Sequence, residues 1–86
     1  MSRLDPPLPD FGGVNNKNQK AILAFGNKLK TLRKSKGLSQ EELANHADIP
    51  INQVGRIERA EVNTTISTIY ALADALKIDV IEFFLK

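Results

Sequence analysis

Apolar residues recur every three or four positions along most of this chain, which is the spacing of helices with one buried face. The longest stripes are Ile22, Phe25, Leu29 and Leu32, and then Ile66, Ile69, Leu72, Ala73 and Leu76. They predict helices over residues 17–36 and 66–76, with two short helices within residues 38–61 and a final short helix over 79–85. The sequence therefore predicts an all-α fold of five helices around one core.

The two short central helices are separated by a break at residues 48–50. Ser39 can cap the first of them, because Glu42 lies three residues later and can accept from the cap N–H in a capping box. Leu43, Ala44 and Ala47 give this helix its apolar side. Pro50 cannot continue a helix but is suited to open a new one.

The second central helix is expected to bury one side and expose the other. Val54 and Ile57, three residues apart, face the core. The opposite face is predicted to carry Asn52, Gly55, Arg56 and Arg59. Asn52 and Arg56 are separated along the axis by about 6 Å, roughly two base-pair steps. Because Asn can pair with an adenine edge and Arg with a guanine edge, this face is suited to a DNA major groove.

Five segments occur in the order and spacing of a known family: Phe25-Gly26, Leu32-Arg33-Lys34, the run from Gly37 to Ala44, Arg56-Ile57-Glu58-Arg59, and the run from Ile69 to Leu76. In these segments the chain resembles the phage-repressor-like (Xre-type) helix-turn-helix domains, over about residues 25–85. The resemblance implies a five-helix, lambda-repressor-like domain. Relative to that pattern, the first helix is extended by about two turns before Phe25.

The resemblance, together with the polar face, assigns base contacts to Ile51, Asn52, Gln53 and Arg56. Phosphate contacts are assigned to Arg33, Gln40, Arg59 and Asn63. Ile51 either meets a thymine methyl or packs under the turn, and Gln40 is otherwise a surface residue. Gly55 either allows close approach to the groove floor or is a tolerated exposed glycine.

Arg33 and Glu58 correspond to a family pair that links the first helix to the recognition helix, and we expect an ion pair between them. Two positions depart from the family pattern. Ala60 stands where glycine is frequent, so the path of the following loop, which carries Asn63, is not fixed by the family pattern. Pro50 replaces a Ser or Thr that is frequent at its position.

The two ends of the chain differ in character. Residues 1–16 contain three prolines and two glycines, and we expect either a flexible leader or an arm that pairs with a second subunit or DNA. Leu4, Leu8 and Phe11 are the anchors available to such an arm. The last helix has five apolar residues in six positions, more than one core-facing side needs. Ile81, Phe84 and Leu85 therefore form a predicted homodimer interface.

Composition narrows the function classes. The net charge of +2 divides into +6 over residues 1–36 and −4 over residues 37–86, so the first part fits either a polyanion partner or a solvated face. With no cysteine and one histidine, His46, the chain predicts no metal site. Catalytic motifs are missing, so we expect no enzyme, no cofactor and no small-molecule ligand. No apolar run approaches the length of a membrane span, and a cytoplasmic location is expected.

The combined prediction is sequence-specific binding of double-stranded DNA by a small homodimeric transcriptional regulator of the repressor or restriction-modification controller type. One helix reads only about four base pairs, so two copies on a roughly palindromic operator are expected. The alternative is a protein-interaction module, such as an antitoxin or coactivator adaptor, whose helices bind another protein.

Overall fold

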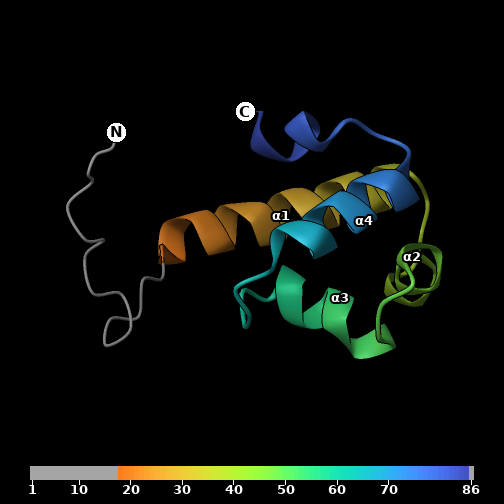
Figure 1. Ribbon diagram of the computed structural model, residues 1–86, viewed down its shortest axis with the longest axis horizontal. Coiled ribbons are helices and arrows are strands. Elements are labelled where there is room, and N and C mark those ends of the chain that lie inside the picture. Colours follow the sequence, from red (N-terminus) through yellow and green to blue (C-terminus); the bar gives the residue numbers. More distant parts are fainter. Residues whose placement is uncertain (1–17, 86) are drawn as a thin grey trace, which may run out of the picture.

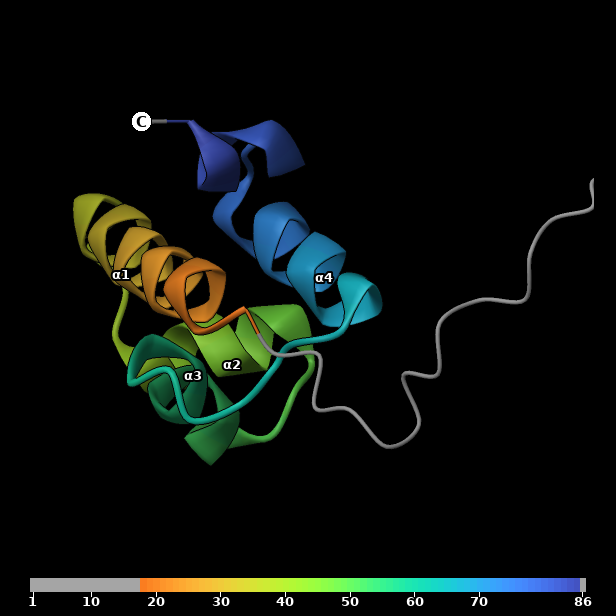
Figure 2. The same cartoon turned by 90° about the vertical axis from the view of Figure 1, so that its left-hand side faces the viewer.

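The computed structural model describes residues 18–85 and consists of helices joined by short turns. The elements are α1 (Gln19–Ser35), α2 (Gln40–Ala47), α3 (Ile51–Glu58), α4 (Ile66–Leu76) and the 3₁₀ helix η1 (Val80–Phe84). Helices α2 and α3 lie on one side of α1 and α4, and η1 lies on the other (Figures 1 and 2). The predicted all-α class is confirmed, whereas the predicted arm over residues 1–16 lies outside the described residues.

Local signals fix most helix ends. The Ser39 hydroxyl accepts from the Glu42 N–H at 3.0 Å and the Glu42 carboxylate accepts from the Ser39 N–H at 2.8 Å, so the predicted capping box is confirmed. Gly37 has a φ of 72° after the end of α1, the left-handed position that favours glycine. Asn18 caps α1, because its side-chain oxygen accepts from the Ala21 N–H at 3.0 Å.

The core lies between α1, α2, α3 and α4. It contains most of the predicted inward residues of each helix, and its fully buried members are Leu29, Leu43, Val54, Ile57, Leu72 and Leu76. Two residues of the predicted stripes lie outside it: Ile22 is only half-buried, and Ile66, the first residue of α4, is 72% exposed. The apolar periodicity therefore located the core but not where it stops.

The last element is a 3₁₀ helix, where a final short helix was predicted. It has five residues, with the Glu82 N–H donating to the Asp79 carbonyl three residues back. Asp79 caps this helix, because its carboxylate accepts from the Ile81 N–H at 3.1 Å. Phe83 is buried and its ring centroid lies 4.8 Å from that of Phe25, so η1 is attached to α1 by aromatic packing.

Candidate nucleic-acid interface

The turn between α2 and α3 brings the two helices together at one end of the domain. Asp48, after the last residue of α2, is left-handed with a φ of 58°, and the Ile49 N–H donates to the Ala44 carbonyl at 3.0 Å. Pro50 then enters α3 with extended backbone angles. The predicted break at residues 48–50 is confirmed, and the two helices with this tight connection form a helix-turn-helix unit.

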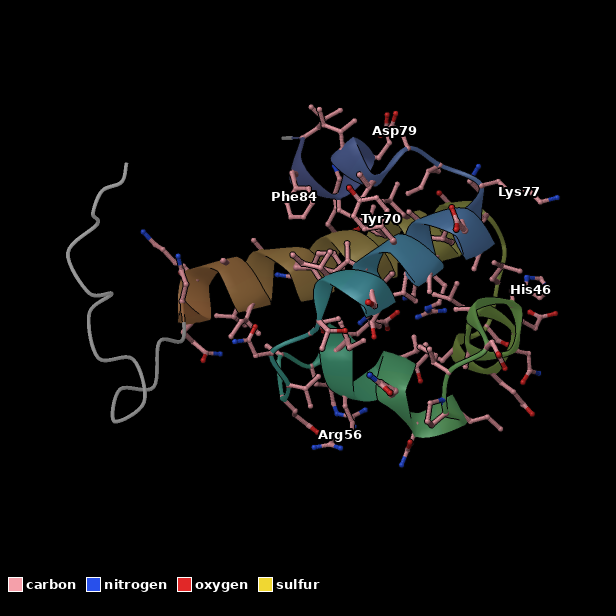
Figure 3. All side chains as sticks on the ribbon, in the orientation of Figure 1. His46, Arg56, Tyr70, Lys77, Asp79 and Phe84 are labelled. Atoms are coloured by element: carbon pink, nitrogen blue, oxygen red, sulfur yellow. The ribbon has the colours of Figure 1, made fainter. Side chains whose placement is uncertain are left out.

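Helix α3 buries one side and exposes the other. Val54 and Ile57 are buried as expected, against α1 and α2. Ile51, Asn52, Arg56 and Arg59 are exposed, and Gln53 is half-buried. Figure 3 shows Arg56 extending from α3 away from the rest of the domain. The described chain thus leaves the polar side of α3 open to solvent.

Gly55 does not lie on that open face. The sequence placed it there with Arg56, but it is buried, and a Cβ at this position would lie 2.9 Å from Arg59 Nη1 and 3.3 Å from Gln40 Oε1. The side chains of two residues named as phosphate contacts therefore cover Gly55. Both readings made from the sequence, groove approach and surface tolerance, assumed exposure and were wrong.

A buried ion pair joins α1 to the end of α3. Arg33 Nε donates to Glu58 Oε2 at 2.6 Å and Arg33 Nη2 donates to Glu58 Oε1 at 3.0 Å. Arg33 Nη1 also donates to the Leu38 carbonyl at 2.8 Å, and Gln40 Nε2 donates to Glu58 Oε1 at 2.9 Å. The hydrogen bond to Glu58 raises the pKa of Arg33 above its ordinary value. Arg33 and Glu58 are 7% and 9% exposed, so their first task is structural.

A second, exposed group of charges follows α3. Arg59 Nε donates to Glu61 Oε2 at 2.6 Å, and Arg56 Nε lies 3.8 Å from Glu61 Oε1. Hydrogen bonding between Arg59 and Glu61 raises the pKa of the guanidinium and lowers that of the carboxylate. The pairing of Glu61 with these arginines was not predicted from the sequence. The available signal was its position just after Ala60, where a left-handed residue turns the chain back towards α3.

Ala60 keeps the backbone that glycine would adopt most readily. Its φ is 61°, and the Glu61 N–H donates to the Arg56 carbonyl at 2.8 Å, which closes the end of α3. Ala60 therefore takes a left-handed conformation that favours glycine, at the cost of some backbone strain. Asn63 is exposed on the loop that follows.

Gly26 is a second residue whose importance the sequence did not reveal. It is buried where α1 crosses α3, and a Cβ there would lie 2.5 Å from the Ile57 carbonyl oxygen and 3.0 Å from that of Glu58. The missing side chain lets the backbone of α1 approach the end of α3 directly. Gly26 thus contributes to the position of the helix that carries the exposed polar face.

The predicted dimer residues lie on a different surface. Ile81, Phe84 and Leu85 are 53%, 62% and 48% exposed, on or just after η1. Phe84 also borders a shallow groove of about 140 Å³ whose lining includes Ile22 and Ile69. Arg56 and Phe84 lie on opposite sides of the molecule (Figure 3), so a duplex against α3 would leave this apolar surface uncovered.

Two features bear on other kinds of site. Within residues 18–85, no group of three or more His, Cys, Asp or Glu side chains is arranged to hold a metal ion. Among the helices described, none combines the length and apolar character that crossing a membrane requires.

Comparison with known proteins finds a helix-turn-helix family model and several regulators of transcription that resemble this chain. The family model described as helix-turn-helix matches residues 29–83. The immunity repressor protein of Bacillus phage phi105 is 36% identical over 58 residues, which cover 67% of this chain and 40% of the repressor. The chain thus corresponds to less than half of that relative's length. An HTH-type transcriptional regulator of Sinorhizobium fredii, itself uncharacterised, is 35% identical over 66% of this chain and 74% of its own.

Solved structures include the restriction-modification controller protein C.AhdI from Aeromonas hydrophila. It is 40% identical, has a TM-score of 0.74, and the match covers 76% of this chain and 98% of that one. The match to the family model includes the capped α2, the turn, α3 with its exposed polar side, and the Arg33–Glu58 pair. From this sequence and structural agreement, the chain belongs to the helix-turn-helix family of DNA-binding transcriptional regulators.

Proposed function

We propose that this protein binds a specific double-stranded DNA sequence as a homodimer and regulates transcription from it, in the manner of a repressor or a restriction-modification controller. The observation that carries the proposal is the open polar side of α3, where Asn52 and Arg56 are exposed on a helix packed against α1 and α2. An exposed helix of this kind, preceded by a packed helix and a tight turn, fits a major groove.

Base reading is assigned to the first two turns of α3. Asn52 and Arg56 are one turn apart and carry the side chains that pair bidentately with adenine and guanine. Gln53 is half-buried and Ile51 is 55% exposed, so a thymine methyl contact by Ile51 is sterically open. These four residues are proposed as the specificity-determining set.

Phosphate contacts are assigned to residues that flank α3. Gln40 opens α2 and Arg59 follows α3, and both side chains lie over Gly55. Asn63 is exposed on the next loop. Arg33 is less available, because three of its five N–H groups already donate within the protein. A phosphate contact by Arg33 is proposed only through the two remaining N–H groups.

Two copies are needed because one eight-residue helix contacts only about four base pairs. The exposed apolar side chains of Ile81, Phe84 and Leu85 are proposed as the interface between the copies. The restriction-modification controller protein C.AhdI matches along 98% of its own chain, which supports a controller-type function for a domain of this size.

The DNA-binding proposal is tested by selecting a preferred duplex from a random pool and measuring affinity for it and for a scrambled duplex across salt concentrations. Affinity should fall steeply with salt and favour the selected sequence. Arg56→Ala should cost about 1–3 kcal/mol on the selected duplex and relax specificity there, whereas Arg59→Ala should weaken both duplexes alike. Equal losses on both duplexes for Arg56→Ala would make it a phosphate contact. A wild-type protein indifferent to all duplexes at low salt would favour the protein-interaction alternative.

The dimer is tested by sedimentation of Phe84→Asp with Ile66→Asp as the matched control. Both replace an exposed apolar residue with a charge, but Ile66 begins α4 and is not part of the proposed interface. Phe84→Asp should give the monomer mass with unchanged helix content, and Ile66→Asp should remain dimeric. A wild-type protein that is already monomeric at all concentrations would contradict the proposal.

A further inference from the structure

Glu61 lies between the two arginines that extend from the recognition helix. Its Oε2 accepts from Arg59 Nε at 2.6 Å, and its Oε1 lies 3.4 Å from Arg59 Nη2 and 3.8 Å from Arg56 Nε. All three side chains are about half exposed. Ion pairs between side chains this exposed add little to the stability of the fold. We therefore expect this arrangement to affect binding.

The backbone holds Glu61 in this position. The left-handed Ala60 turns the chain, and the Glu61 N–H is fixed to the Arg56 carbonyl at 2.8 Å. Gly55 provides the space into which Arg59 folds, since its guanidinium lies where a Cβ would be 2.9 Å away. The Arg59 side chain therefore lies along α3 over Gly55, and its hydrogen bond to Glu61 keeps it there.

Glu61 changes the net charge of the surface at the end of α3. Residues 51–65 carry Arg56 and Arg59 against Glu58 and Glu61. Glu58 is buried and already paired with Arg33, so the charge facing solvent is two guanidinium groups and one carboxylate. Glu61 therefore halves the net positive charge that this end of α3 presents to a polyanion.

From this geometry we infer that Glu61 is an affinity-limiting residue, a carboxylate that competes with DNA phosphate for Arg59. The inference rests on the proposed DNA-binding function. A phosphate that approaches Arg59 must displace the carboxylate or bind beside it, and in either case the negative charge of Glu61 opposes binding. Because phosphate contacts carry no sequence information, Glu61 limits affinity for all duplexes and makes binding depend on two copies acting together.

The test is Glu61→Gln, which keeps the size of the side chain and removes its charge. Affinity should rise about three- to tenfold at low salt on both selected and scrambled duplexes. The slope of log affinity against log salt should steepen by about one, because one more phosphate is neutralised. Asp74→Asn on α4 is the matched control, with the same charge change on an exposed residue of another helix, and should alter affinity less than twofold.

A second comparison separates competition for Arg59 from a general charge effect. In an Arg59→Ala background, Glu61→Gln should lose most of its gain. A gain that persists in full there, or a fall in affinity on Glu61→Gln, would overturn the inference. The latter result would mean that the carboxylate presents Arg59 to DNA or accepts from a base. Failure of the wild-type protein to bind any duplex would instead refute the proposed function, so the two failures are distinguishable.

Discussion

Replacing Arg33 with methionine removes the charge that compensates buried Glu58 while keeping an unbranched apolar stem. Arg33 makes two hydrogen bonds to Glu58 and one to the Leu38 carbonyl, and the variant loses all three. Glu58, 9% exposed, would then keep only its bond from Gln40. Leaving one member of a buried pair uncompensated costs about 3–5 kcal/mol, because the charge stays desolvated without its partner.

A loss of that size is a large share of the roughly 5–15 kcal/mol that stabilises a small domain. Urea denaturation followed by far-ultraviolet circular dichroism should give a midpoint shift of this magnitude, and the melting temperature should fall by roughly 15 °C or more. Lys34→Met is the control, since Lys34 is the exposed neighbour on the same helix. It should change stability by no more than about 0.5 kcal/mol.

The double variant Arg33→Met/Glu58→Leu isolates the cause. If the penalty comes from an uncompensated charge, removing that charge as well should restore much of the stability, because apolar replacements of buried pairs are often neutral. A double variant no more stable than Arg33→Met would refute this reasoning and indicate lost packing. A cost below about 1 kcal/mol for Arg33→Met would also contradict it, since the pair would then behave like an exposed one.

Two further sites give contrasting expectations. Gly26→Ala should destabilise the domain by at least about 1–3 kcal/mol in urea denaturation, because its Cβ would collide with the Ile57 carbonyl and outweigh the better helix propensity of alanine. Gly55→Ala should be neutral or stabilising by up to about 1 kcal/mol, since its Cβ meets only flexible side-chain ends, and equal losses at both glycines would contradict the argument. The Ser39 N–H lowers the pKa of Glu42 in the folded state, so this carboxylate stabilises the protein above about pH 4.3 and the contribution is lost as the pH falls through the lowered pKa. Glu42→Gln should therefore flatten the acidic side of the stability profile, and an unchanged profile would count against the capping bond.

The features that the sequence predicted correctly are those set by neighbouring residues. A capping box requires only Ser39 and Glu42 three positions apart, and a left-handed helix end requires only Gly37. The buried stripes follow from a repeat of 3.6 residues and need no knowledge of the partner helix. For this reason the helices, the break at residues 48–50 and most of the core were correct.

The features that the sequence did not predict depend on residues that are distant along the chain and are brought together by folding. Gly55 was placed on the open face by its spacing from Arg56, but Gln40, fifteen positions earlier, covers it. Gly26 matters only because α3 crosses α1 at that point. The 3₁₀ form of η1 reflects a segment of five residues whose placement depends on Phe83 packing. Neither periodicity nor spacing reports such long-range contacts.

The position of α3 is determined by the fold rather than by the helix itself. Eight residues are fewer than the roughly 12–15 that an isolated helix needs, and Pro50 offers no side-chain cap. Buried Val54 and Ile57, together with the two hydrogen bonds that Arg33 donates to Glu58, therefore set its direction. It follows that weaker DNA binding by Arg33→Met alone is no evidence for a phosphate contact, since a displaced α3 gives the same result. A uniform loss of affinity in the double variant that regains its stability would support a contact of Arg33 with phosphate, because there the helix is seated while the guanidinium is missing together with its buried partner, the Glu58 carboxylate.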